Sequence, residues 1–99
     1  MTDFHLQVYT PERKVFEDRV QSMILPAIGG YVGVLARHAP MVAALDRGTL
    51  TIIRERAGKA ESVSYEVQGG FLEVHRNQAT LLLDQFENHQ APSETLAGT

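Results

Sequence analysis

The feature that most constrains the fold of this sequence is a recurring alternation of apolar and more polar residues in short segments. The first segment covers residues 4–9, where Phe4, Leu6 and Val8 occupy every second position. A period of two places alternate side chains on opposite faces of a strand, so these three residues share one face. A Thr-Pro-Glu sequence at residues 10–12 ends the segment, because proline has no backbone N–H to donate to a sheet. We therefore expect a β-strand with one buried face.

Similar segments recur along most of the chain, each bounded by turn-forming residues. We expect further strands at residues 15–16, 20–25, 31–35, 49–54, 63–67, 72–74 and 79–83. An Ala-Gly-Lys sequence at residues 57–59 predicts a hairpin loop. A helical turn is an alternative only for residues 40–45. About eight or nine strands with turns every 8–12 residues predict an antiparallel sandwich or barrel in a single domain.

The composition supports a small globular domain and excludes several classes of function. Hydrophobic residues make up 43% of the 99 residues, enough for a core, and the formal net charge is −3. The nine Lys and Arg residues are scattered, whereas nucleic-acid binding needs a basic stripe. The sequence has no cysteine, which excludes disulfides and thiolate metal sites. No apolar run approaches the ~20 residues of a membrane span, so we expect any membrane association to go through a partner.

The stretch GGYVGVLARHAPMVAAL, at residues 29–45, places three glycines, a histidine and a proline in an otherwise almost wholly apolar run. It lacks the Gly-Lys-Ser/Thr of a phosphate-binding loop, and the four histidines of the chain show no metal-binding spacing. We therefore expect no catalytic residue, metal or cofactor. His38 is either a turn residue before Pro40 or a side chain at a protein interface. The apolar residues after Pro40 either belong to the core or, where exposed, form a partner surface.

Several motifs taken together resemble the epsilon subunit of F-type ATP synthase, over about residues 3–87. The most specific are Gly30-Tyr31-Val32-Gly33-Val34-Leu35 with His38-Ala39-Pro40, and Gly69-Gly70-Phe71-Leu72-Glu73-Val74. The resemblance implies an all-β fold for residues 1–87, a flattened antiparallel β-sandwich of about ten short strands. The sequence departs from the family at Ala36-Arg37, where Pro-Gly is usual. It also departs at residues 88–99, a short polar C-terminal tail where the family has a helical hairpin; if the chain is the whole subunit, we expect neither hairpin-type inhibition of ATP hydrolysis nor ATP binding.

The resemblance also implies a function and two contact sites. The chain would be a non-catalytic central-stalk (rotor) subunit of F1Fo ATP synthase, docking the gamma subunit onto the membrane c-ring and coupling ion translocation to ATP synthesis. It would work in a complex with alpha, beta and delta subunits, as a peripheral membrane protein on the cytoplasmic face of a bacterial inner membrane. The gamma interface would comprise Thr10, His38, Ala39, Pro40, Met41 and Ala43, and the c-ring-facing loop would comprise Ile28, Gly29, Gly30 and Tyr31.

The residues alone also allow a function of another class. An autonomous β-sandwich could bind a small ligand, or could bind a peptide at a sheet edge. Co-purification separates the two hypotheses, because a rotor subunit should be recovered together with alpha, beta and gamma chains.

Overall fold

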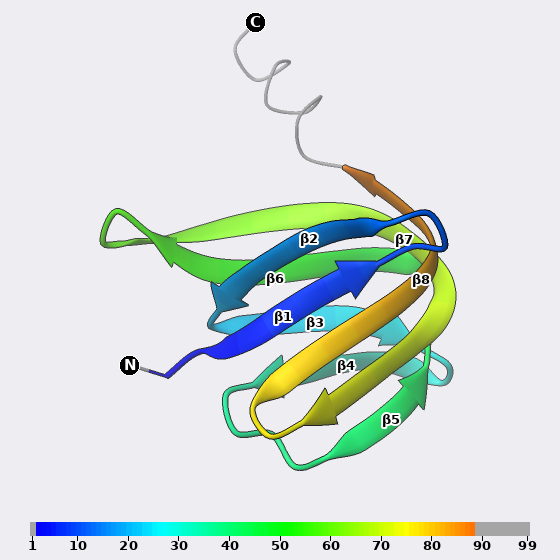
Figure 1. Cartoon of the computed structure of the whole chain (residues 1–99), viewed down its shortest axis with the longest axis horizontal. Coiled ribbons are helices and arrows are strands. Elements are labelled where there is room, and N and C mark those ends of the chain that lie inside the picture. The colour runs from blue at the N-terminus through cyan, green and yellow to red at the C-terminus, as the bar shows by residue number, and fades with distance from the viewer. Residues whose placement is uncertain (1, 89–99) are drawn as a thin grey trace, which may run out of the picture.

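A computed structural model describes residues 2–88, and these residues form eight β-strands and no helix (Figure 1). The tail expected at residues 88–99 lies outside the described residues, apart from the backbone of Asn88. The hairpin loop falls at residues 57–58, within the range expected from the sequence. The strands in chain order are β1 (Phe4–Tyr9), β2 (Lys14–Val20), β3 (Ser22–Ala27), β4 (Gly30–Leu35), β5 (Met41–Ala44), β6 (Gly48–Arg56), β7 (Lys59–His75) and β8 (Gln78–Asn88).

The strands form one hydrogen-bonded path in the order β2-β1-β8-β7-β6-β3-β4, and β5 pairs with β7 off this path. Every pair is antiparallel except β1 with β8, which run parallel. The predicted all-β fold is therefore confirmed, with one parallel pair that the sequence did not indicate. The eight strands are fewer than the ten that the resemblance implied. One reason is that β7 runs without a break through residues 59–75, where two strands were expected.

Two long strands, β7 and β8, belong to both layers of the sandwich and curve from one layer into the other (Figure 1). β7 pairs with β6 over residues 59–67 and with β5 over residues 71–74, while β8 pairs with both parts of β7. The first layer therefore contains β2, β1, β8, β7 and β5, and the second contains β8, β7, β6, β3 and β4. Between the two parts of β7, Gly69 and Gly70 have positive φ angles of 68° and 108°. A Cβ atom at Gly70 would collide with the carbonyl of Leu82, so the bend requires glycine there.

The hydrophobic core lies between the two layers and uses alternate positions of the strands. Burial alternates along β1, where Phe4, Leu6 and Val8 are buried as predicted. A fully buried side chain of this size contributes roughly 1.5–3 kcal/mol, so these strands hold the layers together mainly through the core. The other core residues with almost no exposed surface include Val20, Met23, Leu25, Val34, Leu50, Ile52, Leu72 and Leu81.

The segment at residues 40–45, for which a helical turn was the alternative, contains strand β5. Its residues pair with the second part of β7, Met41 with Val74 and Ala43 with Leu72. This pairing satisfies the backbone of a segment that is too short to be stable as a helix in water. The helical alternative is therefore wrong, and the correct structure depends on a partner strand about 30 residues further along the chain.

Aromatic side chains pack between β2, the part of β7 before Gly69 and the C-terminal part of β8. The Phe16 and Tyr65 rings meet edge to face with centroids 6.0 Å apart, and Tyr65 stacks on Phe86 at 4.5 Å. The guanidinium of Arg54 lies 5.7 Å from the Phe16 ring centroid and forms an ion pair of 3.0 Å with Asp18 on β2. These contacts tie β2 of the first layer to β6 and β7 of the second, so the two layers act as one body.

Candidate functional site

The outer face of the first layer carries a group of neighbouring apolar side chains, most of them exposed. The register pairs Ala44 on β5 with Phe71 on β7, Phe71 with Leu82 on β8, and Leu82 with Tyr9 on β1. Phe71 and Leu82 are 55% and 53% exposed, and Val42, two residues before Ala44 on the same strand face, is 72% exposed. We call Tyr9, Val42, Ala44, Phe71 and Leu82 the apolar face. A contiguous exposed apolar surface often marks a contact with another molecule.

The alternation of β5 decides which of its side chains reach this face. Val42 and Ala44 are exposed, whereas Met41 and Ala43 are partly buried and pack against the core. The sequence-based prediction named Met41 and Ala43 as interface residues, and the structure directs their side chains inward. The sequence-based prediction did not name Val42. Counting back by twos from the buried Leu45 would have indicated that Val42 and Ala44 point outward.

Thr10 lies at one border of the apolar face, in the turn between β1 and β2. Its backbone N–H donates to the carbonyl of Arg13 at 2.9 Å and closes this turn. An open hollow of about 280 Å³ lies where the turn meets the apolar face. Its lining includes Thr10, Pro11, Phe71 and Leu82. The structure therefore brings the predicted residue Thr10 together with two apolar residues that the sequence did not single out as a site.

The predicted residues His38, Ala39 and Pro40 lie in the turn between β4 and β5, directly before Met41. The His38 N–H donates to the carbonyl of Leu35 at 3.2 Å, and its ring Nδ1 donates to the carbonyl of Ala39 at 2.8 Å. Ala39 and Pro40 are exposed, and His38 is partly buried. The interpretation of His38 as a turn residue before Pro40 is therefore confirmed, and its place at a protein interface stays a prediction.

The predicted c-ring-facing loop is the tight turn Ile28-Gly29 between β3 and β4, followed by Gly30 and Tyr31 at the start of β4. Ile28 and Tyr31 are exposed, at 64% and 57%, and the loop carries no charge. The Ile28 N–H donates to the carbonyl of Ala44 at 2.9 Å, and the Tyr31 hydroxyl accepts a backbone hydrogen bond from β6 at 3.1 Å. β4 runs from this loop to the turn that holds His38, so the two predicted contact sites lie at opposite ends of β4.

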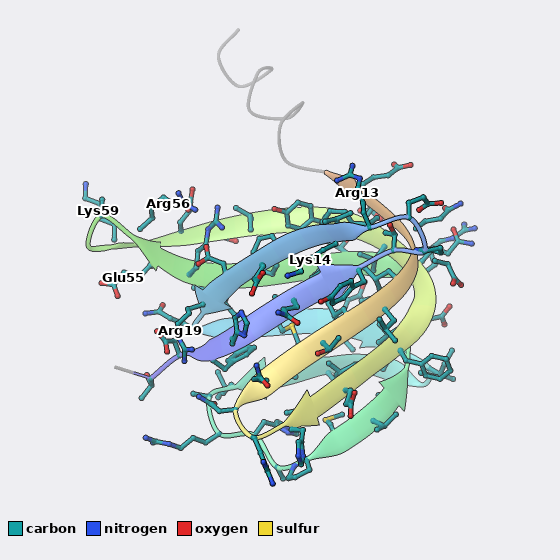
Figure 2. The ribbon with its side chains drawn as sticks, in the orientation of Figure 1. Arg13, Lys14, Arg19, Glu55, Arg56 and Lys59 are labelled. Atoms are coloured by element: carbon teal, nitrogen blue, oxygen red, sulfur yellow. The ribbon has the colours of Figure 1, made fainter. Side chains whose placement is uncertain are left out.

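The rest of the same outer face, on β1 and β2, is polar. Glu17 accepts hydrogen bonds from Lys14 at 2.6 Å and Gln7 at 3.0 Å, and its carboxylate lies 2.7 Å from the Nε2 of His5. We call these four residues the polar cluster; Figure 2 shows Lys14 on β2, where the cluster lies. The hydrogen bond from Lys14, followed by those from Gln7 and His5, lowers the pKa of Glu17 to about 2. The Glu17 carboxylate therefore stays charged at any physiological pH.

Potential metal ligands are spread over the described surface. Among residues 2–88, no three His, Cys, Asp or Glu side chains gather closely enough to hold a metal ion. The same residues contain no helix with the length and apolar character that crossing a membrane would require. What this part of the chain does present is an apolar face between two turns, an arrangement suited to protein contact.

Comparison with known proteins gives matches to both the sequence and the fold. The family model described as ATP synthase, Delta/Epsilon chain, beta-sandwich domain matches residues 3–89. An ATP synthase epsilon chain from Moorella thermoacetica is 41% identical over 91 residues, which cover 91% of this chain and 65% of that protein. One from Caldicellulosiruptor bescii is 37% identical over 87 residues, covering 88% of this chain and 61% of that protein. The chain thus spans less than two thirds of the length of these relatives.

Two solved structures share the fold at low sequence identity. A chain in the Euglena gracilis mitochondrial ATP synthase structure of OSCP, F1 and c-ring gives a TM-score of 0.78 at 21% identity, covering 97% of this chain and 60% of that one. A chain in the Tetrahymena thermophila mitochondrial ATP synthase central stalk and c-ring gives 0.69 at 13% identity, covering 88% of this chain and 67% of that one. At these identities the likeness establishes the fold alone.

Proposed function

The chain belongs to the family of ATP synthase delta/epsilon β-sandwich domains, and we propose that it is a non-catalytic subunit of the central stalk. In this role it docks the gamma subunit onto the membrane c-ring and couples ion translocation to ATP synthesis. The complex would also contain alpha, beta and delta subunits. The relatives from bacteria support a peripheral location on the cytoplasmic face of a bacterial inner membrane.

The observation that carries this proposal is the apolar face and its position between Thr10 and the His38–Pro40 turn. Val42, Phe71 and Leu82 are each more than half exposed on one surface, and covering them with a protein removes apolar area from water. We assign this surface to gamma, with Thr10 at one border and His38, Ala39 and Pro40 at the other. Met41 and Ala43 support it from beneath, because they hold β5 against the core.

The second contact of the proposal is the loop formed by Ile28, Gly29, Gly30 and Tyr31, which we assign to the c-ring. The loop has a defined shape before any partner binds, since the Ala44 carbonyl of β5 accepts from the Ile28 N–H and the Thr49 N–H of β6 donates to the Tyr31 hydroxyl. A contact that is ordered in advance loses less entropy on binding. With no charge in the loop, we expect this contact to depend on apolar and hydrogen-bonding groups and to be little affected by salt.

Mechanically, the two contacts are joined by an uninterrupted sheet. β4 connects the loop at Ile28 to the turn at His38, and β7 and β8 carry the hydrogen-bonded ladder through both layers. A force applied at one contact is therefore transmitted to the other through backbone hydrogen bonds and a close-packed core. The chain's own role is to hold gamma and the c-ring in fixed register while the catalytic subunits perform the chemistry.

The test is reconstitution of the chain with purified gamma subunit and purified c-ring from the same organism. We expect a chain–gamma complex in size-exclusion chromatography, recovery of both with the c-ring, and no ATP hydrolysis by the chain alone. Failure to bind gamma, together with specific binding of a small ligand or an extended peptide, would favour an autonomous binding module instead. ATP hydrolysis that persists after removal of all F1 contaminants would refute the non-catalytic assignment.

A further inference from the structure

One end of the sandwich gathers basic side chains from two turns that are distant in sequence. The β4–β5 connection contributes Arg37 and His38, the last residue of β7 is His75, and the β7–β8 turn contributes Arg76. The backbone N–H of Arg37 donates to Oδ1 of Asn77 at 2.7 Å, which links the two turns. The two turns lie together at the lower end of the view in Figure 1. We call Arg37, His38, His75 and Arg76 the basic end.

The two arginines of the basic end have no acidic partner within the described chain. Arg37 and Arg76 are exposed and form no ion pair with any of residues 2–88. Arg19, also near this end, differs because it is paired with Asp3 at 2.9 Å, and Asn77 donates to the backbone carbonyl of Asp3 at 3.0 Å. The chain as a whole carries a net charge of −3, and two unpaired guanidinium groups at one end make the local potential there more positive.

The backbone conformation of the same two residues shows that glycine can replace either of them without strain. Arg37 has a φ angle of 65° and Arg76 one of 53°, both in the left-handed region. Glycine adopts this region without strain, whereas a residue with a Cβ atom is strained there. The chain thus holds a long cationic side chain at two positions where glycine would be more stable. Both conformations belong to tight turns: Arg76 and Asn77, with a φ angle of 60°, are the two central residues of the β7–β8 hairpin, and Arg37 precedes the His38 N–H that closes the turn onto Leu35.

From this arrangement we infer that the basic end binds a carboxylate-rich segment of the protein that covers the apolar face. The inference rests on the proposed function, in which that protein is gamma. The basic end adjoins the apolar face directly, because Pro40 leads into β5 and Met41 pairs with Val74, one residue before His75. Each guanidinium can donate two parallel hydrogen bonds to a carboxylate. Attraction to an anionic membrane surface typically requires clusters of about four to eight Lys or Arg, more than this end provides.

The experiment compares the wild-type chain with the double variant Arg37→Gly/Arg76→Gly in calorimetric titration against purified gamma subunit. The glycines remove both charges and relieve the left-handed strain, so the variant should fold at least as well as the wild type. We expect its affinity for gamma to be about tenfold lower at about 50 mM salt, and the difference to shrink to about twofold or less at about 500 mM salt.

The matched control is Lys59→Glu, at the tip of the β6–β7 hairpin (Figure 2), which changes the net charge by the same amount as the double variant. It should bind gamma like the wild type. An affinity and salt dependence unchanged in the double variant would overturn the inference, as would an equal loss in Lys59→Glu. Wild-type binding to phosphatidylglycerol vesicles that the double variant loses, with gamma binding intact, would also overturn it in favour of a membrane contact. If the wild type itself does not bind gamma, the proposed function fails instead.

Discussion

The outer face of the first layer has two halves that are joined by hydrogen bonds. The exposed side chains of one half are polar, and those that define the other half are apolar. On β1 and β2, the polar cluster satisfies its own charges, since Glu17 accepts from Lys14 and Gln7 and lies against His5. On β5, β7 and β8, the apolar face leaves Val42 72% exposed with nothing to cover it in the isolated chain. A surface that bonds to itself gains little from a partner, whereas an exposed apolar surface gains free energy when it is covered.

The magnitudes decide which half should control binding. Burying one large apolar side chain contributes roughly 1.5–3 kcal/mol, and the apolar face offers Val42, Phe71 and Leu82. Ion pairs on an exposed surface contribute little net free energy, because solvent screens them and side-chain entropy is lost. We therefore expect the apolar half to set the affinity for gamma and the polar half to be nearly neutral.

The largest effect should come from Gly70→Ala, because Gly70 positions both the apolar residues of β7 and their neighbours on β8. Its φ angle is 108°, and a Cβ atom would collide with the carbonyl of Leu82. We expect a loss of unfolding free energy of about 3–5 kcal/mol, measured by urea denaturation. The control is Gly58→Ala, where φ is 79° but no atom lies within 4 Å of the added Cβ; strain alone should cost about 1–2 kcal/mol. Equal losses in the two variants would show that the bend tolerates a side chain.

The next effect separates two neighbours on β5 that face opposite ways. Met41→Asp puts a carboxylate among core residues and should lower the unfolding free energy by about 2–4 kcal/mol. Val42→Asp puts the same group on the exposed face, directly opposite Glu73 on β7, so stability should fall by only about 0.5–1 kcal/mol. Its affinity for gamma should nevertheless fall by about 10- to 100-fold, as expected for a charge in an apolar contact.

Urea denaturation and calorimetric titration of gamma, applied to both variants, give the two readouts. Full gamma affinity in a well-folded Val42→Asp chain would mean that gamma does not cover the apolar face. A stable Met41→Asp chain that has lost gamma binding would instead place the Met41 side chain at the interface, as the sequence-based prediction had it. Thr51→Asp on β6 of the second layer serves as a control for charge added to a partly exposed strand position away from the apolar face.

The sequence predicted those parts of the fold that depend on local pattern. The alternation of Phe4, Leu6 and Val8 specified a strand with one buried face, and the structure buries these residues. The hairpin loop at residues 57–58 was predictable because its turn chemistry is local. The parallel pairing of β1 with β8 was not predictable, since a strand's pattern shows which side is buried and not which strand lies beside it.

The same limit explains what was missed at the candidate site. Phe71 and Leu82 form part of the apolar face only because β7 and β8 pair them directly, and no local signal marks that pairing. The family motifs indicated Thr10, the His38 turn and the Ile28 loop as contact sites, but the orientation of the side chains at residues 41–44 depends on strand alternation in β5. Alternation could not be used there while a helical turn remained an alternative for the segment.

The smallest effect should come from Glu17→Gln, which removes the centre of the polar cluster and leaves the apolar face intact. Glu17 has a folded-state pKa of about 2, lowered from its ordinary value of 4.5 mainly by the hydrogen bond from Lys14. Because the folded pKa is depressed, the stabilisation is fully present above the ordinary pKa and is lost as the pH falls through about 2. The wild type should therefore be slightly more stable than Glu17→Gln at about pH 6, and their thermal midpoints should converge at about pH 2. Glu12→Gln, at an exposed carboxylate in the neighbouring turn, should match the wild type at both pH values.

Both variants should bind gamma with wild-type affinity at neutral pH. If Glu17→Gln weakened gamma binding as much as Val42→Asp does, gamma would have to cover both halves of the face, and the distinction between them would fail.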